Sequence, residues 1–70
     1  MSRHVFVALV EYDYEPSHFL GVFETEKGAI AALRDHAGGR LRDRRPRVDN
    51  WLAWGNGSTT RSVGRVEVHP

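Results

Sequence analysis

The chain contains no cysteine, and this absence removes two of the ways in which small proteins are stabilised. A chain of 70 residues buries only about 60% of the surface that its unfolded form exposes, so it usually depends on disulfides, a metal or self-association. Without cysteine, disulfides and thiolate metal sites are excluded. Self-association, a metal site of His and carboxylate ligands, or marginal stability remain, and we predict a single domain over residues 1–70 that associates with itself. The same absence is typical of a reducing compartment, and we expect a cytoplasmic protein.

Long apolar runs are also missing. The longest wholly apolar stretch is VFVALV, residues 5–10, whereas a membrane-spanning helix needs about 20 such residues. Glu11 and Asp13 follow this stretch, in place of the small residues of a signal-peptide cleavage site. We expect a soluble, unprocessed protein without a membrane partner.

Lysine is scarce, since Arg outnumbers Lys nine to one, and the net charge is only +1. The charges are nevertheless separated along the chain. Five arginines lie within residues 40–47, which we call the Arg loop: Arg40, Arg42, Arg44, Arg45 and Arg47. Three acids, Glu11, Asp13 and Glu15, lie together elsewhere. Such a separation bears on partners rather than on the fold.

The first half of the chain predicts a hairpin. Residues 4–12, HVFVALVEY, and residues 18–24, HFLGVFE, are rich in β-branched and aromatic residues and indicate two strands. Residues 13–17, DYEPS, indicate the turn between them. Gly21, in the middle of the second strand, indicates a bulge or a close backbone approach.

A helix is predicted to follow at once. Thr25 is a good N-cap, and residues 26–37 carry an apolar stripe of helical spacing. The stripe consists of Ala29, Ile30, Leu33 and Ala37. Gly38 and Gly39 can adopt the left-handed conformation that ends many helices.

The second half predicts two more strands after the Arg loop, which shows no periodicity. These are residues 48–54 and 61–69, joined by a GNGST turn over residues 55–59. The order strand, strand, helix, strand, strand predicts an α+β domain with one mainly antiparallel sheet and one helix on one face. We expect Phe6 and Val10 on the uncovered face, which either the two Trp residues or a second copy must cover. Self-pairing through residues 61–68 as an edge strand is the alternative route to a dimer.

The stretch that leads through the acidic turn into the helix reads EYDYEPSHFLGVFETEKGAIAAL. It resembles small uncharacterised proteins of actinobacterial phages and related bacteria, which combine a Val-rich strand, an acidic Tyr-containing turn and a Gly-Val-Phe-Thr/Ser run before an Ala-rich helix. The matching positions are Tyr12, Asp13, Tyr14, Gly21, Val22, Phe23 and Thr25, with the alanines of the helix. The resemblance covers roughly the first half of the chain. It implies an α+β fold and an accessory protein of a phage or an actinobacterium, and it implies no catalytic residue.

Large aromatic side chains favour a protein–protein interaction module. Tyr, Trp and Arg dominate interface hot spots, and Tyr12, Tyr14, Trp51 and Trp54 are the candidate binding residues. We expect a non-catalytic homodimer that acts on a host protein or on itself.

Nucleic-acid binding is the alternative function. Arg42, Arg44 and Arg45 could contact phosphates while Trp51 and Trp54 stack on bases. The net charge of +1 argues against a dedicated nucleic-acid binder.

The sequence does not favour an enzyme or a cofactor. Ser17 and His18 are adjacent and point to opposite faces of a strand, so they are badly placed as nucleophile and base. The histidines occur singly, without the spacing of helix-borne metal ligands: His4, His18, His36 and His69. We expect no catalytic site, no metal and no cofactor.

Overall fold

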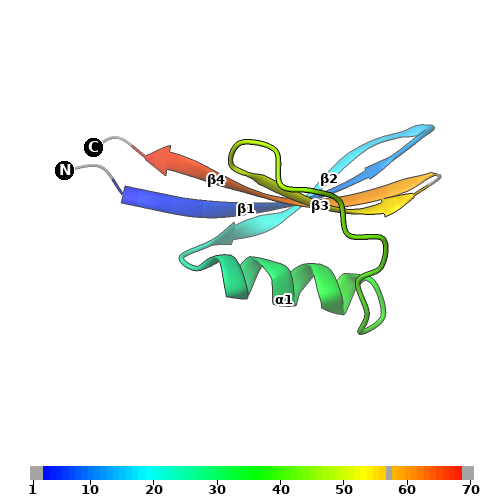
Figure 1. Ribbon diagram of the computed structural model, residues 1–70, viewed down its shortest axis with the longest axis horizontal. Helices are drawn as coiled ribbons and strands as arrows, with labels where there is room; N and C mark the ends of the chain where they lie inside the picture. Colours follow the sequence, from blue (N-terminus) through cyan, green and yellow to red (C-terminus); the bar gives the residue numbers. More distant parts are fainter. Residues whose placement is uncertain (1–2, 57, 69–70) are drawn as a thin grey trace.

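The computed structural model describes residues 3–56 and 58–68 (Figure 1). These residues form the strands β1 (Arg3–Tyr12), β2 (Glu15–Phe23), β3 (Trp51–Asn56) and β4 (Thr59–Val68), and the helix α1 (Glu26–His36). All strand pairs are antiparallel in one sheet, and α1 lies on one side of it. The predicted α+β class and the predicted order of elements are confirmed.

The order of strands in the sheet is β2-β1-β4-β3. The first and last strands therefore form its centre, paired from Arg3 with Val68 to Tyr12 with Thr59. β4 is hydrogen-bonded to β1 along its whole length and to β3 over residues 59–64. The prediction that residues 61–68 could pair as an edge strand is therefore wrong for residues 61–64, whereas residues 65–68 have no β3 residue beside them.

The β1–β2 turn is shorter than predicted. Tyr12 is paired with Glu15, so only Asp13 and Tyr14 connect the strands, and Pro16 belongs to β2. Pro16 is tolerated there because β2 is an edge strand of the sheet, where a missing N–H breaks no ladder. The bulge expected near Gly21 is confirmed by a register shift opposite Ala8 and Leu9 and by the positive φ of 155° at Gly21.

The helix begins and ends as predicted. The Thr25 hydroxyl accepts a hydrogen bond from the Gly28 N–H at 3.0 Å, and Ala37 is the C-cap. Gly38 and Gly39 follow with φ of 83° and 101°, a conformation that favours glycine.

The hydrophobic core lies between α1 and one face of the sheet, the helix face. Its buried members are Ala8, Val10, Ala29, Leu33, Leu52, Trp54 and Val63, with Phe6, Tyr12 and Ile30 half-buried around them. The prediction that Phe6 and Val10 occupy the uncovered face is therefore wrong. The first strand is apolar on both faces, so its sequence does not reveal which face receives the helix.

The third strand begins later than predicted. Residues 48–50 precede it as a tight turn, in which Val48 and Trp51 exchange backbone hydrogen bonds of 3.1 and 2.9 Å. Asp49 has φ of 54°, a conformation that Asp tolerates better than most residues. At the other end, β3 extends to Asn56 and β4 starts at Thr59; residue 57 of the predicted turn and residue 69 of the predicted strand lie outside the described residues.

Candidate functional site

The Arg loop is fastened to the outer edge of β3. The Arg45 N–H donates to the Ala53 carbonyl at 2.9 Å, and the Gly55 N–H donates to the Asp43 carbonyl at 3.1 Å. The Arg45 side chain adds a bond from Nε to the Gly55 carbonyl at 3.1 Å. The loop therefore protects an edge that could otherwise pair with another chain. Nothing in its sequence periodicity indicated this role.

Arg47 ties the same loop to the helix. Its Nη2 lies 3.0 Å from Oε1 of Glu26, in the first turn of α1. Two arginines of the loop, Arg45 and Arg47, are thus engaged in holding the fold. Arg44, a predicted binding residue, lies opposite Trp54 in an isolated bridge, and its exposed side chain makes no hydrogen bond or ion pair to another described residue.

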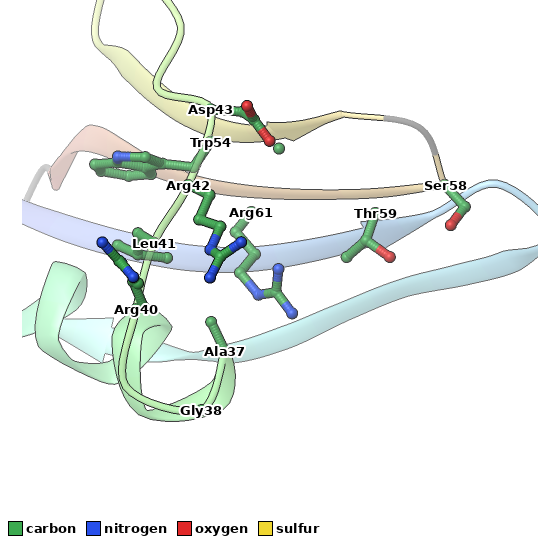
Figure 2. A pocket seen from close by; sticks show the side chains of 11 residues that line it. Ala37, Gly38, Arg40, Leu41, Arg42, Asp43, Trp54, Ser58, Thr59 and Arg61 are labelled. Atoms are coloured by element: carbon green, nitrogen blue, oxygen red, sulfur yellow. The ribbon is translucent and has the colours of Figure 1, made fainter.

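A cavity of about 630 Å³ opens between the end of α1, the start of the Arg loop and the β3–β4 hairpin (Figure 2). We call it the Arg pocket; residues that line it include Arg42, Arg61, Leu41, Trp54, Ser58 and Thr59. Figure 2 shows the guanidinium groups of Arg42 and Arg61 pointing into it, toward Ala37. Asp43 and Arg40 also line the pocket, but in Figure 2 their charged groups point away from that space.

Arg61 is the unusual member of the Arg pocket. It stands on the helix face between Val10 and Trp54, its partners on the neighbouring strands. Its Nε is buried and has no hydrogen-bond partner among the described residues. Leaving a buried donor unpaired costs about 1–3 kcal/mol, so this atom is a strong indicator of a missing acceptor. Sequence reasoning did not select Arg61, although an Arg at an inward position of a strand is an available signal.

The two tryptophans lie on opposite faces of the sheet. Trp54 is in the core, only 8% exposed, whereas Trp51 lies on the other face with its ring over Gly64. A Cβ on Gly64 would come within 2.5 Å of that ring, which shows how closely the ring covers the backbone. The predicted binding residues Trp51 and Trp54 are therefore not brought together, and they form no continuous stacking surface.

The two predicted binding tyrosines also differ. Tyr14 is almost fully exposed at the β1–β2 turn. Tyr12 is half-buried against the core, and its ring meets the His18 ring edge-on at 5.2 Å. The Asp13 N–H donates to the Ser58 carbonyl at 3.0 Å, which links this turn to the β3–β4 hairpin.

The sheet face opposite the helix, which we call the open face, is apolar and uncovered in the described part of the chain. Its apolar side chains are Val5, Val7, Leu9, Phe19, Val22, Trp51, Ala53, Val66 and Val68, and Ser62 and Gly64 lie among them. Phe19 is 61% exposed and Val22 is 56% exposed. Trp51 covers Gly64. The apolar β1 side chains of this face and Ala53 are half-buried, and its exposed apolar side chains are Phe19, Val22, Trp51, Val66 and Val68.

The histidines of the described residues are dispersed over three elements of the fold. His4 lies on β1, His18 on β2 and His36 on α1, while His69 lies outside the described residues. Within residues 3–56 and 58–68, no group of three or more His, Cys, Asp or Glu side chains could hold a metal ion. No helix in these residues is long and apolar enough to cross a membrane.

Comparisons with protein-family models, curated proteins and solved structures found no match to this chain.

Proposed function

We propose that this chain is a small non-catalytic protein–protein interaction module that assembles as a homodimer through its open face. The observation that supports the proposal is the apolar open face itself. Large exposed apolar patches are uncommon on monomeric soluble proteins and mark interfaces. The accessory role in a phage or an actinobacterium, implied by the resemblance, is part of this proposal, with a host protein as a further partner.

Charges at the two ends of the open face favour a second copy as the occupant. Arg3 lies at one end of β1, where its Nη2 is 3.3 Å from Oε1 of Glu24, and Glu11 lies at the other end on the same face. In a face-to-face dimer whose two-fold axis lies in the interface, perpendicular to the strands, β1 of one copy runs opposite to β1 of the other. Arg3 of one copy then lies near Glu11 of the other. Opposite charges at a rim fix orientation and help encounter more than they add affinity.

The edges of the sheet favour face-to-face association over strand pairing. The Arg loop is hydrogen-bonded to the outer edge of β3. The other edge, β2, contains Pro16, which lacks a backbone N–H, and a bulge at Gly21. Proline and bulges are devices that discourage edge pairing. The open face is then the remaining extended surface for a second copy.

The nucleic-acid alternative loses one of its two supports. It required Trp51 and Trp54 to stack on bases beside the Arg loop, and these side chains lie on opposite faces of the sheet. Arg45 and Arg47 are engaged in contacts within the fold. What remains for this alternative is the positive charge of the loop.

Replacing Val22 with Glu tests the proposal. The purified parent chain is expected to run as a dimer by light scattering, with a melting temperature that rises with concentration. Val22→Glu places a carboxylate in the interface and weakens the dimer by roughly a hundredfold, because a buried unpaired charge is costly. The variant stays folded, since Val22 is exposed in a single copy.

The matched control is Ala31→Glu, which adds the same charge to an exposed position of α1 on the other side of the sheet. It should leave the dimer intact. A parent chain that is monomeric at high concentration, or a control that dissociates as much as Val22→Glu does, contradicts the proposal.

A further inference from the structure

Two guanidinium groups in the Arg pocket carry charge that no described residue neutralises. Arg42 and Arg61 point into the pocket and make no hydrogen bond or ion pair with another described residue. Other arginines of the chain do find partners: Arg3, Arg45 and Arg47 bond to Glu24, Gly55 and Glu26. Arg44 and Arg65 also lack a partner among the described residues but do not line the pocket, so the distinguishing feature of Arg42 and Arg61 is that they lack a partner and point into one cavity.

We propose that the Arg pocket binds a small organic phosphate monoester. Such a group carries about −1.5 to −2 charges near neutral pH, which matches the two inward-pointing guanidinium groups. Guanidinium donors match phosphate oxygens in pairs, so the two inward-pointing groups of Arg42 and Arg61 can share one phosphate. A phosphodiester of a nucleic-acid backbone carries a single charge per phosphate and balances this pair less well.

The remaining walls of the pocket fit the organic part of the ligand. The volume of about 630 Å³ lies within the range of small-molecule sites and leaves room beyond a phosphate group. Leu41 and Trp54 form an apolar wall, and Ser58 and Thr59 supply hydroxyl groups at the hairpin end. The lining as a whole is more polar than apolar, which suits a ligand with a charged group and a small organic part.

The end of α1 offers a competing explanation for the arginines, since cations are stabilised near the carboxyl end of a helix. The carbonyl groups there already have partners. The Ala37 N–H bonds to the Leu33 carbonyl, and the N–H groups of Gly38 and Gly39 bond to the carbonyls of Asp35 and Arg34. These carbonyl groups therefore do not require the guanidinium groups as hydrogen-bond donors. The buried Arg61 Nε still lacks an acceptor.

The Arg pocket lies on the helix face, so its ligand and the proposed dimer through the open face can be tested separately. The test is an amide NMR titration of the parent chain with phenyl phosphate at constant ionic strength. We expect saturable shifts confined to the residues around the pocket. Arg61→Gln should weaken binding roughly tenfold or more, because it removes charge-assisted hydrogen bonds.

The matched control is Arg65→Gln, which removes the same charge from the same strand and the same face, outside the pocket. It should leave the affinity within about twofold, because distant exposed charges are screened. If Arg61→Gln does not fold, Arg42→Gln serves in its place, since Arg42 is an exposed loop residue.

Four results overturn the proposal. If phenyl phosphate does not bind the parent chain, the Arg pocket is not a phosphate site. Equal loss of binding in Arg61→Gln and Arg65→Gln reduces it to a general attraction of anions. If inorganic phosphate binds as tightly as phenyl phosphate, the apolar wall does not contribute to binding. Displacement of phenyl phosphate by a single-stranded oligonucleotide without a terminal phosphate reassigns the pocket to phosphodiesters.

Discussion

The two faces of the sheet differ in exposure far more than in composition. Ala8 and Val10 on β1 are fully buried beneath α1. Their neighbours on the same strand, Val7 and Leu9, are equally apolar and point to the open face. A single helix covers a single face, so the apolar side chains of the other face have no covering element among the described residues. Substitutions on the two faces and in the Arg loop test this difference in exposure.

The largest effect is expected for Leu33→Ala. Leu33 is fully buried between α1 and the helix face, and removing it costs about 2–5 kcal/mol in the free energy of unfolding. Val66→Ala on the open face should cost less than about 0.5 kcal/mol in the dissociated chain, since Val66 is exposed there. Chemical denaturation of both variants, at concentrations where the chain is monomeric, measures the difference. Equal losses would mean that the two faces are equally covered within one copy.

Gly64→Ala tests the contact between the Trp51 ring and the backbone of Gly64 on the open face. The new methyl group meets the indole ring and displaces it, at an expected cost of about 1–3 kcal/mol. The displaced ring becomes more exposed, so the fluorescence of Trp51 should shift to longer wavelength. In a Trp51→Ala background the same Gly64 change should cost less free energy of unfolding. The loss in the double variant should therefore differ from the sum of the two single losses by about 0.5 kcal/mol or more. Strict additivity would show that the ring does not lie on Gly64 in solution.

Arg47→Ala is expected to have the smallest effect. It removes the contact with Glu26 that ties the Arg loop to α1, and an ion pair this exposed contributes about 0–1 kcal/mol. The loss should shrink at high salt. Arg44→Ala is the control, because the Arg44 side chain has no partner among the described residues. A salt-independent loss of similar size in both variants would show that the loop is held by other contacts.

The fold class followed from local signals that act within a few residues. Thr25, Gly38 and Gly39 fix the ends of α1 through backbone hydrogen bonds and conformations that need no tertiary contact. The face of β1 that receives the helix is different, because it depends on the register between strands and on the bulge at Gly21. The coverage of one face by α1 was therefore predictable from the sequence, whereas Phe6 and Val10, expected on the other face, lie on the helix face.

The candidate sites were less predictable than the fold. The Arg pocket combines Arg42 from the loop with Arg61 from β4, and only the sheet topology brings these residues together. Trp51 and Trp54 are three positions apart and were grouped by their type, yet alternation along a strand sends them to opposite faces. The position of Tyr12 and Tyr14 at the acidic turn predicts that both are exposed; this holds for Tyr14, whereas Tyr12 is half-buried against the core.

The pairing of β1 with β4 at the centre of the sheet also governs the order in which the molecule can fold. The first and last strands are joined along their whole length, and β3 reaches the sheet only through β4. During synthesis, the β1–β2 hairpin and α1 are made before β4, which pairs with β1 and completes their core. Contacts so distant in sequence slow folding, and the waiting apolar surface is exposed to aggregation. The sheet of this chain can therefore be completed only after β4 has been translated.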